Sequence, residues 1–227
     1  MKIKELILQT TNVEAEKDFY SDVLGFPIKQ ASQTHFTIKV GWTLLTFKYA
    51  SKAQNYHYCF LIPANKLQEA VVWLETRMDI IKISETKKTV HFKDWNAESV
   101  YFYDASGNVV EFIIRHDLNN FTDDNFNINQ IICVHEIGMP TTNISAINCQ
   151  LETTLGTNFW KGDLKRFGVH GDLEGIFLLP NYNFKTTWFP TEVAVLPVTF
   201  QAAVKTNKGH FEVQFENEKL KITKRGW

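Results

Sequence analysis

Three residues far apart in the sequence combine the chemistry of metal ligands with a regular spacing. His57 follows Glu5 by 52 positions, and Glu111 follows His57 by 54. An imidazole and two carboxylates form a hard-to-borderline donor set that suits Fe(II), Mn(II), Ni(II) or Zn(II) and leaves coordination positions open for a substrate or oxygen. The three side chains can share one ion only if the elements that carry them bring them to one surface.

The first of these elements is a strand that opens a βαβββ unit. Alternation predicts a strand over residues 3–10, and Asn12 is typical of the cap of a helix that closes at Gly25. Three further strands are indicated near 26–30, 35–41 and 43–49.

The same order returns after residue 55. A strand is predicted over 56–62, and Asn65 with Gln68 forms a capping-box pattern before a helix over 66–78. Further strands are indicated near 80–84, 88–93, 99–103 and 109–115. The polar residues 117–130 have the composition of a linker, so we expect one domain over 1–116 and a second over 131–227.

An internal repeat marks the start of the second domain. Residues 5–25 and 136–156 align without a gap at an offset of 131, with seven identical pairs, where chance would give about one or two. These pairs are Glu5/Glu136, Thr10/Thr141, Thr11/Thr142, Asn12/Asn143, Ala15/Ala146, Leu24/Leu155 and Gly25/Gly156. Beyond Gly156 the chain reads as strands without another helix, which predicts one full βαβββ module followed by a reduced one.

The predicted fold is α+β, with tandem βαβββ modules that form a U-shaped, half-open mixed sheet and carry their helices on the outer face. Strand alternation then places Glu5, His57 and Glu111 on the inner face, within one crevice formed by residues 1–116. Glu136 repeats Glu5, but the strand expected to open the last module has no counterpart of His57. We therefore expect no second metal site, and a second half that supports the crevice or forms a homodimer contact.

Composition excludes several classes of function. The net charge of −1 and the pI near 6.7 provide no general attraction for nucleic acid or anionic membranes. The sequence contains no apolar run long enough to span a membrane and no apolar signal core, so we expect a cytoplasmic protein. Aromatic residues make up 14% of the chain, and Trp188-Phe189-Pro190 is expected either to cover the crevice or to pack in a loop or subunit contact.

Two motifs resemble the vicinal oxygen chelate superfamily, which includes glyoxalase I, extradiol dioxygenases and bleomycin-resistance proteins. NVEAEKDFYSDVLGF is similar to its capped opening helix, and YFYDASGNVVEF to its Asp-Pro-x-Gly-Asn-x-x-Glu ending, with Ala105 in place of proline. The resemblance covers 3–116 well and 131–180 more loosely. It implies Glu5, His57 and Glu111 as metal ligands, although the first is more often histidine in the family. Leu45 or Thr46 stands where glyoxalase I has a further glutamate, which disfavours that enzyme's chemistry.

A longer resemblance to extradiol dioxygenases runs through His91, Val100-Tyr101 and the turn that leads from Asp104 to Glu111. It implies that His91 is an acid/base group and that Tyr101 donates a hydrogen bond to a substrate oxygen. The alternative is an exposed strand histidine and a tyrosine at the edge of the core.

These features predict a divalent-metal-dependent enzyme that acts on a small oxygenated, possibly aromatic substrate by dioxygenase-like, lyase or isomerase chemistry. The rival is a metal-free protein that sequesters a small ligand, as bleomycin-resistance proteins do. A third alternative is a structural or regulatory protein whose crevice is filled by its own side chains.

Overall fold

The structure, a computed structural model, describes residues 1–226 and has the predicted α+β class. The first module consists of β1 (Lys2–Thr10), α1 (Val13–Asp18) with a π-helical continuation η1 (Phe19–Val23), β2 (Ile28–Ala31), β3 (His35–Val40) and β4 (Thr43–Tyr49). The second consists of β5 (His57–Leu61), α2 (Leu67–Glu75), β6 (Ile80–Ile81), β7 (Thr89–Phe92), β8 (Ala97–Tyr103) and β9 (Val109–Arg115), with a 3-10 turn η2 (Lys93–Trp95) before β8.

The third module repeats this order, and the fourth is reduced. The third consists of β10 (Cys133–Gly138), α3 (Ile144–Leu155), β11 (Phe159–Gly162), β12 (Phe167–Asp172) and β13 (Gly175–Pro180). The fourth contains β14 (Phe200–Thr206), β15 (Gly209–Glu216) and β16 (Lys219–Lys224), without a helix between its strands.

The asparagine pair of the internal repeat makes the same contact in both modules. The Asn12 side chain accepts a hydrogen bond from the Ala15 backbone N–H at 3.1 Å, and Asn143 accepts one from Ala146 at 3.0 Å. Each bond satisfies a donor that the first helical turn leaves without a partner. The repeat therefore fixes where α1 and α3 begin.

Residues 117–130 pack against α2 instead of forming a free linker. They include the short turns η3 (His116–Leu118) and η4 (Ile128–Gln130), and the Phe126 ring lies 5.6 Å from that of Trp73. The predicted capping box is wrong, because α2 begins after Lys66 and has no side-chain cap. The Asn65 amide instead bonds the backbone of Thr122, at 2.8 and 3.2 Å.

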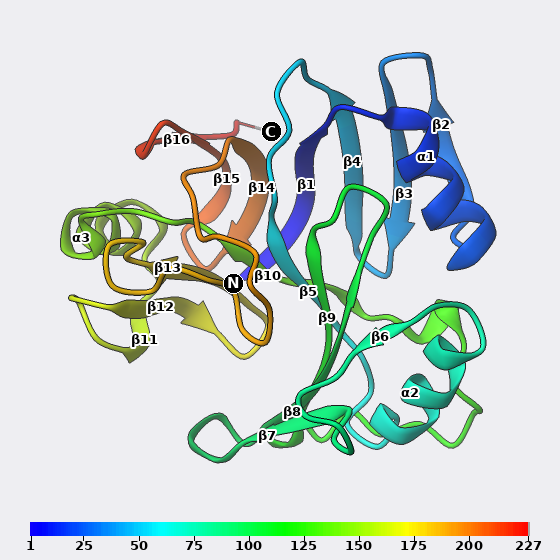
Figure 1. The fold of residues 1–227 in the computed structure, drawn as a ribbon. Coiled ribbons are helices and arrows are strands. Elements are labelled where there is room, and N and C mark those ends of the chain that lie inside the picture. Colours follow the sequence, from blue (N-terminus) through cyan, green and yellow to red (C-terminus); the bar gives the residue numbers. More distant parts are fainter. Residues whose placement is uncertain (227) are drawn as a thin grey trace.

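The strands form two mixed sheets, shown in Figure 1. The seven-stranded sheet has the order β16-β15-β14-β1-β4-β3-β2. The nine-stranded sheet has the order β11-β12-β13-β10-β5-β9-β8-β6, with β7 also paired to β8. The second module thus pairs with the third, and the first with the reduced fourth.

This pairing corrects the prediction that one crevice lies within residues 1–116. Each module presents an opening strand that is able to pair, and β5 pairs antiparallel with β10 while β1 pairs antiparallel with β14. Strand alternation decides which way a side chain faces, but it carries no information about which strand lies alongside. Both sheets therefore combine strands from before and after residues 117–130.

The apolar faces of both sheets and all three α-helices share one core. It contains Leu6 of β1, Phe60 of β5, Leu74 of α2, Leu151 of α3 and Phe200 of β14, among others. On each sheet the helices thus lie on the apolar face. The opposite face of each sheet carries Glu5 and Glu111, respectively.

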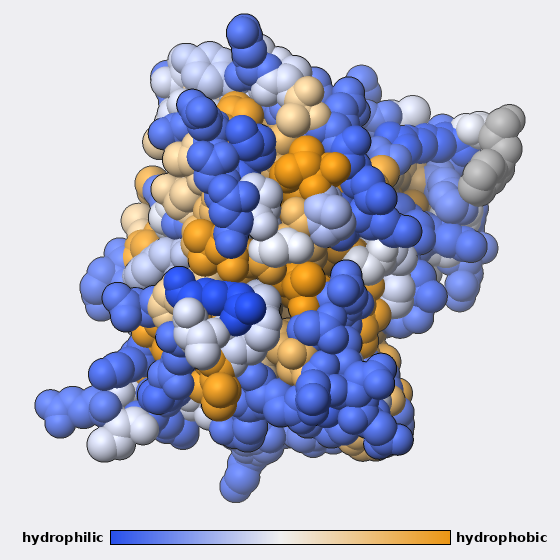
Figure 2. All heavy atoms as spheres, turned by 90° about the vertical axis from the view of Figure 1, so that its right-hand side faces the viewer, coloured by the Kyte–Doolittle hydropathy of each residue, from blue (hydrophilic) through white to orange (hydrophobic). Residues whose placement is uncertain are grey.

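The core reaches the surface on the side of α1 and α2. Figure 2 shows apolar residues in the middle of this face, between hydrophilic regions. Partly buried residues that pack against the core include Phe19, Trp73 and Ile80. Within residues 1–226, no helix combines the length and the apolar character needed to cross a membrane.

Candidate metal centre

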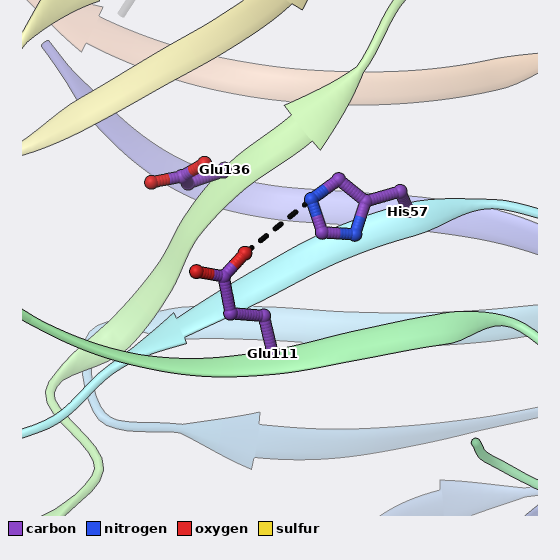
Figure 3. A group of neighbouring side chains, drawn as sticks. All are labelled: His57, Glu111 and Glu136. Carbon is purple, nitrogen blue, oxygen red and sulfur yellow. Dashed lines mark ion pairs between the residues drawn. The ribbon is translucent and has the colours of Figure 1, made fainter. Parts of the chain in front are cut away.

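Three adjacent strands bring an imidazole and two carboxylates together. His57 of β5, Glu111 of β9 and Glu136 of β10 each offer one ligand atom, and these atoms all lie within 4.8 Å of one another. The register explains the meeting, because Cys59 of β5 pairs with Glu136 on one side and with Glu111 on the other. Figure 3 shows the three side chains converging from their strands. We call them the His57 cluster.

The His57 ring is held in one orientation. Its Nδ1 lies 2.9 Å from the Val109 carbonyl oxygen, which can only accept, so Nδ1 carries a hydrogen. Its Nε2 lies 3.4 Å from Oε2 of Glu111. Burial alone lowers the pKa of His57, but the hydrogen bond and charge of Glu111, together with the Val109 carbonyl, outweigh it and raise the pKa.

Glu136 is held by a second layer of buried groups. Its Oε1 accepts a hydrogen bond from Nη2 of Arg115 at 2.7 Å and lies 3.1 Å from Nδ1 of His135. Burial alone raises the pKa of Glu136, but the His135 hydrogen bond and the Arg115 charge outweigh it and lower the pKa to about 2. Glu136 is therefore a carboxylate at neutral pH, although only 2% of its surface is exposed.

Arg115 is itself placed by aromatic rings. Its guanidinium carbon lies 5.2 Å from the ring centre of Trp95 and 5.0 Å from that of Trp160. Such cation–π contacts lower the cost of burying a charge. Arg115 is fully buried, so it provides a fixed positive charge behind Glu136.

The His57 cluster lines a cavity of about 430 Å³. Its other lining residues include the aromatic side chains of Phe92, Trp95, Tyr101, Phe167, Trp188 and Phe189, and the charged residues Asp163, Arg166 and Lys185. The Trp188 ring packs 4.9 Å from the His57 ring. Of the two arrangements considered for Trp188-Phe189-Pro190, the structure thus shows this segment covering the crevice.

Glu5 does not join the cluster, which corrects the ligand set inferred from the sequence. It lies in β1 of the seven-stranded sheet, and the guanidinium of Arg225 binds its two carboxylate oxygens at 3.0 and 3.3 Å. The reason is the pairing of modules, since β5 lies beside β10 and not beside β1. Glu136, which repeats Glu5, occupies the third position instead.

The two residues that the resemblance implies as catalytic, His91 and Tyr101, lie in different places. Tyr101 lines the cavity opposite Glu111 in the β8–β9 register. Burial, and then the charge of Glu111, raises the pKa of Tyr101 well above its ordinary value. His91 is not among the cavity-lining residues; it faces Glu98 across β7 and β8, and its side chain is 48% exposed. Its neighbour Phe92 points into the cavity instead, as alternation along β7 requires.

The sequence interpretation missed Glu136 as a member of the candidate metal centre, Arg115 and His135 as its support, and the cavity cations Arg166 and Lys185. The repeat already marked Glu136 as the equivalent of Glu5. Nothing in the local sequence of the other four residues distinguishes them from ordinary charged side chains.

Comparison with proteins of known structure identifies the fold. No family model matches the sequence, and no curated protein is significantly similar to it. A proposed dioxygenase from Bacillus subtilis shares the fold over 97% of this chain and 83% of its own, with a TM-score of 0.62 and 15% identity. Glyoxalase I from Zea mays aligns with 78% of this chain and 66% of its own, with a TM-score of 0.51 and 10% identity.

This chain has the vicinal oxygen chelate fold. The fold expected from the two sequence motifs is therefore confirmed. At 10% and 15% identity, the comparisons show a shared fold and do not identify the reaction.

Proposed function

We propose that the protein is an enzyme that binds one divalent metal ion through His57, Glu111 and Glu136 and acts on a small oxygenated substrate in the adjoining cavity. The observation that carries this proposal is the meeting of one imidazole and two carboxylates within 4.8 Å, all lining one cavity. The donor set suits Fe(II), Mn(II), Ni(II) or Zn(II).

The surrounding residues fit a ligand role. The Val109 carbonyl fixes His57 so that Nε2 is the nitrogen offered to an ion, which is the usual arrangement for a ligating histidine. Arg115 and His135 both contact Oε1 of Glu136, which makes Oε2 the oxygen offered to an ion. Because the pKa of His57 is raised, metal binding is expected to release a proton and to weaken at low pH.

When bound, the ion would supply a Lewis acid for two neighbouring substrate oxygens. The chain itself would supply the rest. Tyr101, whose raised pKa keeps it protonated, would donate a hydrogen bond to a substrate oxygen. Trp188 and Phe189 would exclude water from the bound substrate. Because His91 lies outside the cavity, Tyr101 is the remaining residue that supports dioxygenase-like chemistry. Lyase and isomerase reactions are the other classes.

The test measures metal content and metal affinity for the purified protein and three variants. The wild type should hold one equivalent, and His57→Ala and Glu136→Gln should weaken binding by more than about 100-fold, since even residues behind a ligand contribute 10–100-fold. Glu5→Gln is the matched control and should bind as the wild type does. Equal, negligible metal in the wild type and His57→Ala would overturn the proposal.

One observation favours a second candidate, a metal-free ligand-binding protein. The His57–Glu111 contact and the Arg115–Glu136 pair already give each carboxylate a partner without an ion. In that case apolar aromatic ligands should raise the melting temperature while a chelator leaves it unchanged. For the enzyme, a chelator should lower it.

A further inference from the structure

Two positively charged side chains, Arg166 and Lys185, line the same cavity. Arg166 lies just before β12, and Lys185 lies in the segment between β13 and β14. Within residues 1–226, neither forms an ion pair with a carboxylate. Asp163 also lines the cavity, but its Oδ1 accepts the backbone N–H groups of Lys165 and Arg166, at 2.7 and 2.6 Å. These backbone hydrogen bonds, and to a lesser extent the charge of Arg166, lower the pKa of Asp163, so its carboxylate is engaged mainly by its own turn.

The position of Lys185 makes an unpaired charge costly. Its Nζ donates to the Thr187 carbonyl oxygen at 3.0 Å and lies 5.9 Å from the ring centre of Phe167. Partial burial lowers the pKa of Lys185, and the positive charge of Arg166 lowers it further. An anion between the two cations would remove this repulsion and gain charge-assisted hydrogen bonds.

The walls of the cavity suit a flat ring. Phe189 packs at 72° against Phe92, with ring centres 6.3 Å apart, and at 88° against Tyr101, with ring centres 6.0 Å apart. A ligand ring beside these side chains would gain edge-to-face or offset contacts of the same kind, which an aliphatic ligand would not. The same cavity thus combines metal-ligand candidates, aromatic walls and a pair of cations.

We propose that Lys185 and Arg166 bind an anionic group of the substrate, so that the substrate is an aromatic carboxylate that also presents oxygens to the His57 cluster. The carboxylate and the two cations form one recognition site, and the aromatic residues hold the ring between it and the cluster. The part of this proposal that concerns the chelating oxygens of the substrate rests on the proposed function. The part that concerns its carboxylate rests only on the residues that line the cavity.

The experiment compares matched ligand pairs by the quenching of tryptophan fluorescence, since Trp95 and Trp188 line the cavity. The probes are catechols with a carboxylate attached directly or through one or two methylene groups, each beside its neutral amide. The same series is measured with benzoate and benzamide, which lack the chelating hydroxyls. All titrations are run with and without added metal ion.

The best carboxylate should bind about tenfold more tightly than its amide, as expected for a hydrogen-bonded charge. Lys185→Met and Arg166→Gln should each reduce this ratio, and the double variant should bring it close to one. Lys165→Met is the matched control, because its ammonium lies over Phe184 and does not line the cavity. It should keep the ratio of the wild type.

The two proposals fail in different ways. A ratio near one in the wild type, with catechols still preferred over benzoates when metal is present, would overturn the carboxylate site and leave the metal enzyme. A ratio that persists without metal and in His57→Ala, while the wild type itself binds no metal, would support the carboxylate site and remove the metal enzyme. A ratio unchanged in the Lys185→Met/Arg166→Gln variant would overturn the assignment of these two residues.

Discussion

Glu5 and Glu136 occupy the same position of the repeat and have different surroundings. Each follows a strand bulge and faces away from the core, Glu5 opposite Ala203 of β14 and Glu136 opposite Cys59 of β5. Yet the Glu136 side chain is 3% exposed and held by buried Arg115, whereas the Glu5 side chain is 38% exposed and held by Arg225. The same local sequence signal therefore leads to a buried cluster in one sheet and an exposed ion pair in the other.

The neighbouring strands explain the difference. By register, Ile7 of β1 pairs with Gln201 of β14 on one side and Thr46 of β4 on the other, as Cys59 of β5 pairs with Glu136 and Glu111. Gln201 and Thr46 therefore stand beside Glu5 as Glu136 and Glu111 stand beside His57, and the Thr46 hydroxyl pairs with that of Thr37 at 2.8 Å. One sheet offers an imidazole and two carboxylates, and the other offers an amide, a hydroxyl and one carboxylate. A single repeated glutamate thus becomes a metal-ligand candidate only where its neighbours supply the rest of the set.

The largest expected effect comes from removing the arginine behind each glutamate. Arg115→Met should lower the free energy of unfolding by about 3–5 kcal/mol, because it leaves Glu136 buried and uncompensated. Arg225→Met should cost less than about 1 kcal/mol, because the Glu5 pair is exposed to water. Urea unfolding of both variants measures the difference.

The double variant Arg115→Met/Glu136→Leu is the control, since replacing both partners should recover most of the loss. Equal costs for Arg115→Met and Arg225→Met would show that burial does not separate the two glutamates.

A smaller effect is expected where Trp188 covers the cluster. A Cβ atom at Gly138 would lie 2.6 and 2.8 Å from two ring carbons of Trp188, whereas the equivalent residue of β1 is Ile7. Gly138→Ala should therefore cost about 1–3 kcal/mol and shift the tryptophan emission to longer wavelength as Trp188 moves. Unfolding and emission spectra report both changes.

In a Trp188→Leu background, the added methyl group should have little further cost, because the clash is gone. A full cost there would place the clash elsewhere.

A pH-dependent effect is expected where the first and second modules meet. Glu16 of α1 is buried, and its Oε2 accepts a hydrogen bond from Ser106 at 2.6 Å. Burial and then the charge of Asp104 raise the pKa of Glu16 to about 10. The folded protein thus keeps a proton that the unfolded chain releases near pH 4.5, so stability falls as the pH rises between these values, by at most about 1.4 kcal/mol per pH unit.

Glu16→Gln should remove this slope and raise stability at pH 8. Urea unfolding at pH 6, 7 and 8 measures it. An unchanged slope would mean that Glu16 is ionised in the folded protein.

Much of this architecture follows from local sequence. The caps at Asn12 and Asn143, the left-handed turn at Gly156 and the facing of His57 and Glu111 all depend on residues close in the chain. Strand alternation predicted correctly that Glu5 faces away from the core. These features could be predicted because propensity and periodicity act over a few residues.

The predictions that were wrong depended on how segments distant in the sequence pair with one another. Pairing β10 with β5 decides that Glu136 and not Glu5 meets His57, and residues on either strand do not encode that choice alone. His91 lies outside the cavity for a different reason. The order of the motif residues matched and the spacer was slightly long, but alternation along β7 turns Phe92 toward the cavity instead. The role of Arg115 could not be predicted either, because it depends on packing between Trp95 and Trp160, which are 65 residues apart in the sequence.

The smallest expected effect is a gain, and it tests whether the neighbours alone distinguish the two sheets. In a His57→Ala background, where the native cluster has lost its imidazole, Gln201→His and Thr46→Glu would rebuild the same donor set around Glu5. Because Glu5 lacks the buried support that Arg115 and His135 give to Glu136, metal binding should be at least about 100-fold weaker than at the native cluster. Calorimetric titration with Zn(II) measures it, with Gln201→Ala/Thr46→Glu in the same background as the control. Binding equal to the native site would show that the three donors suffice, and no gain over the control would show that the buried support is what makes the nine-stranded sheet a site.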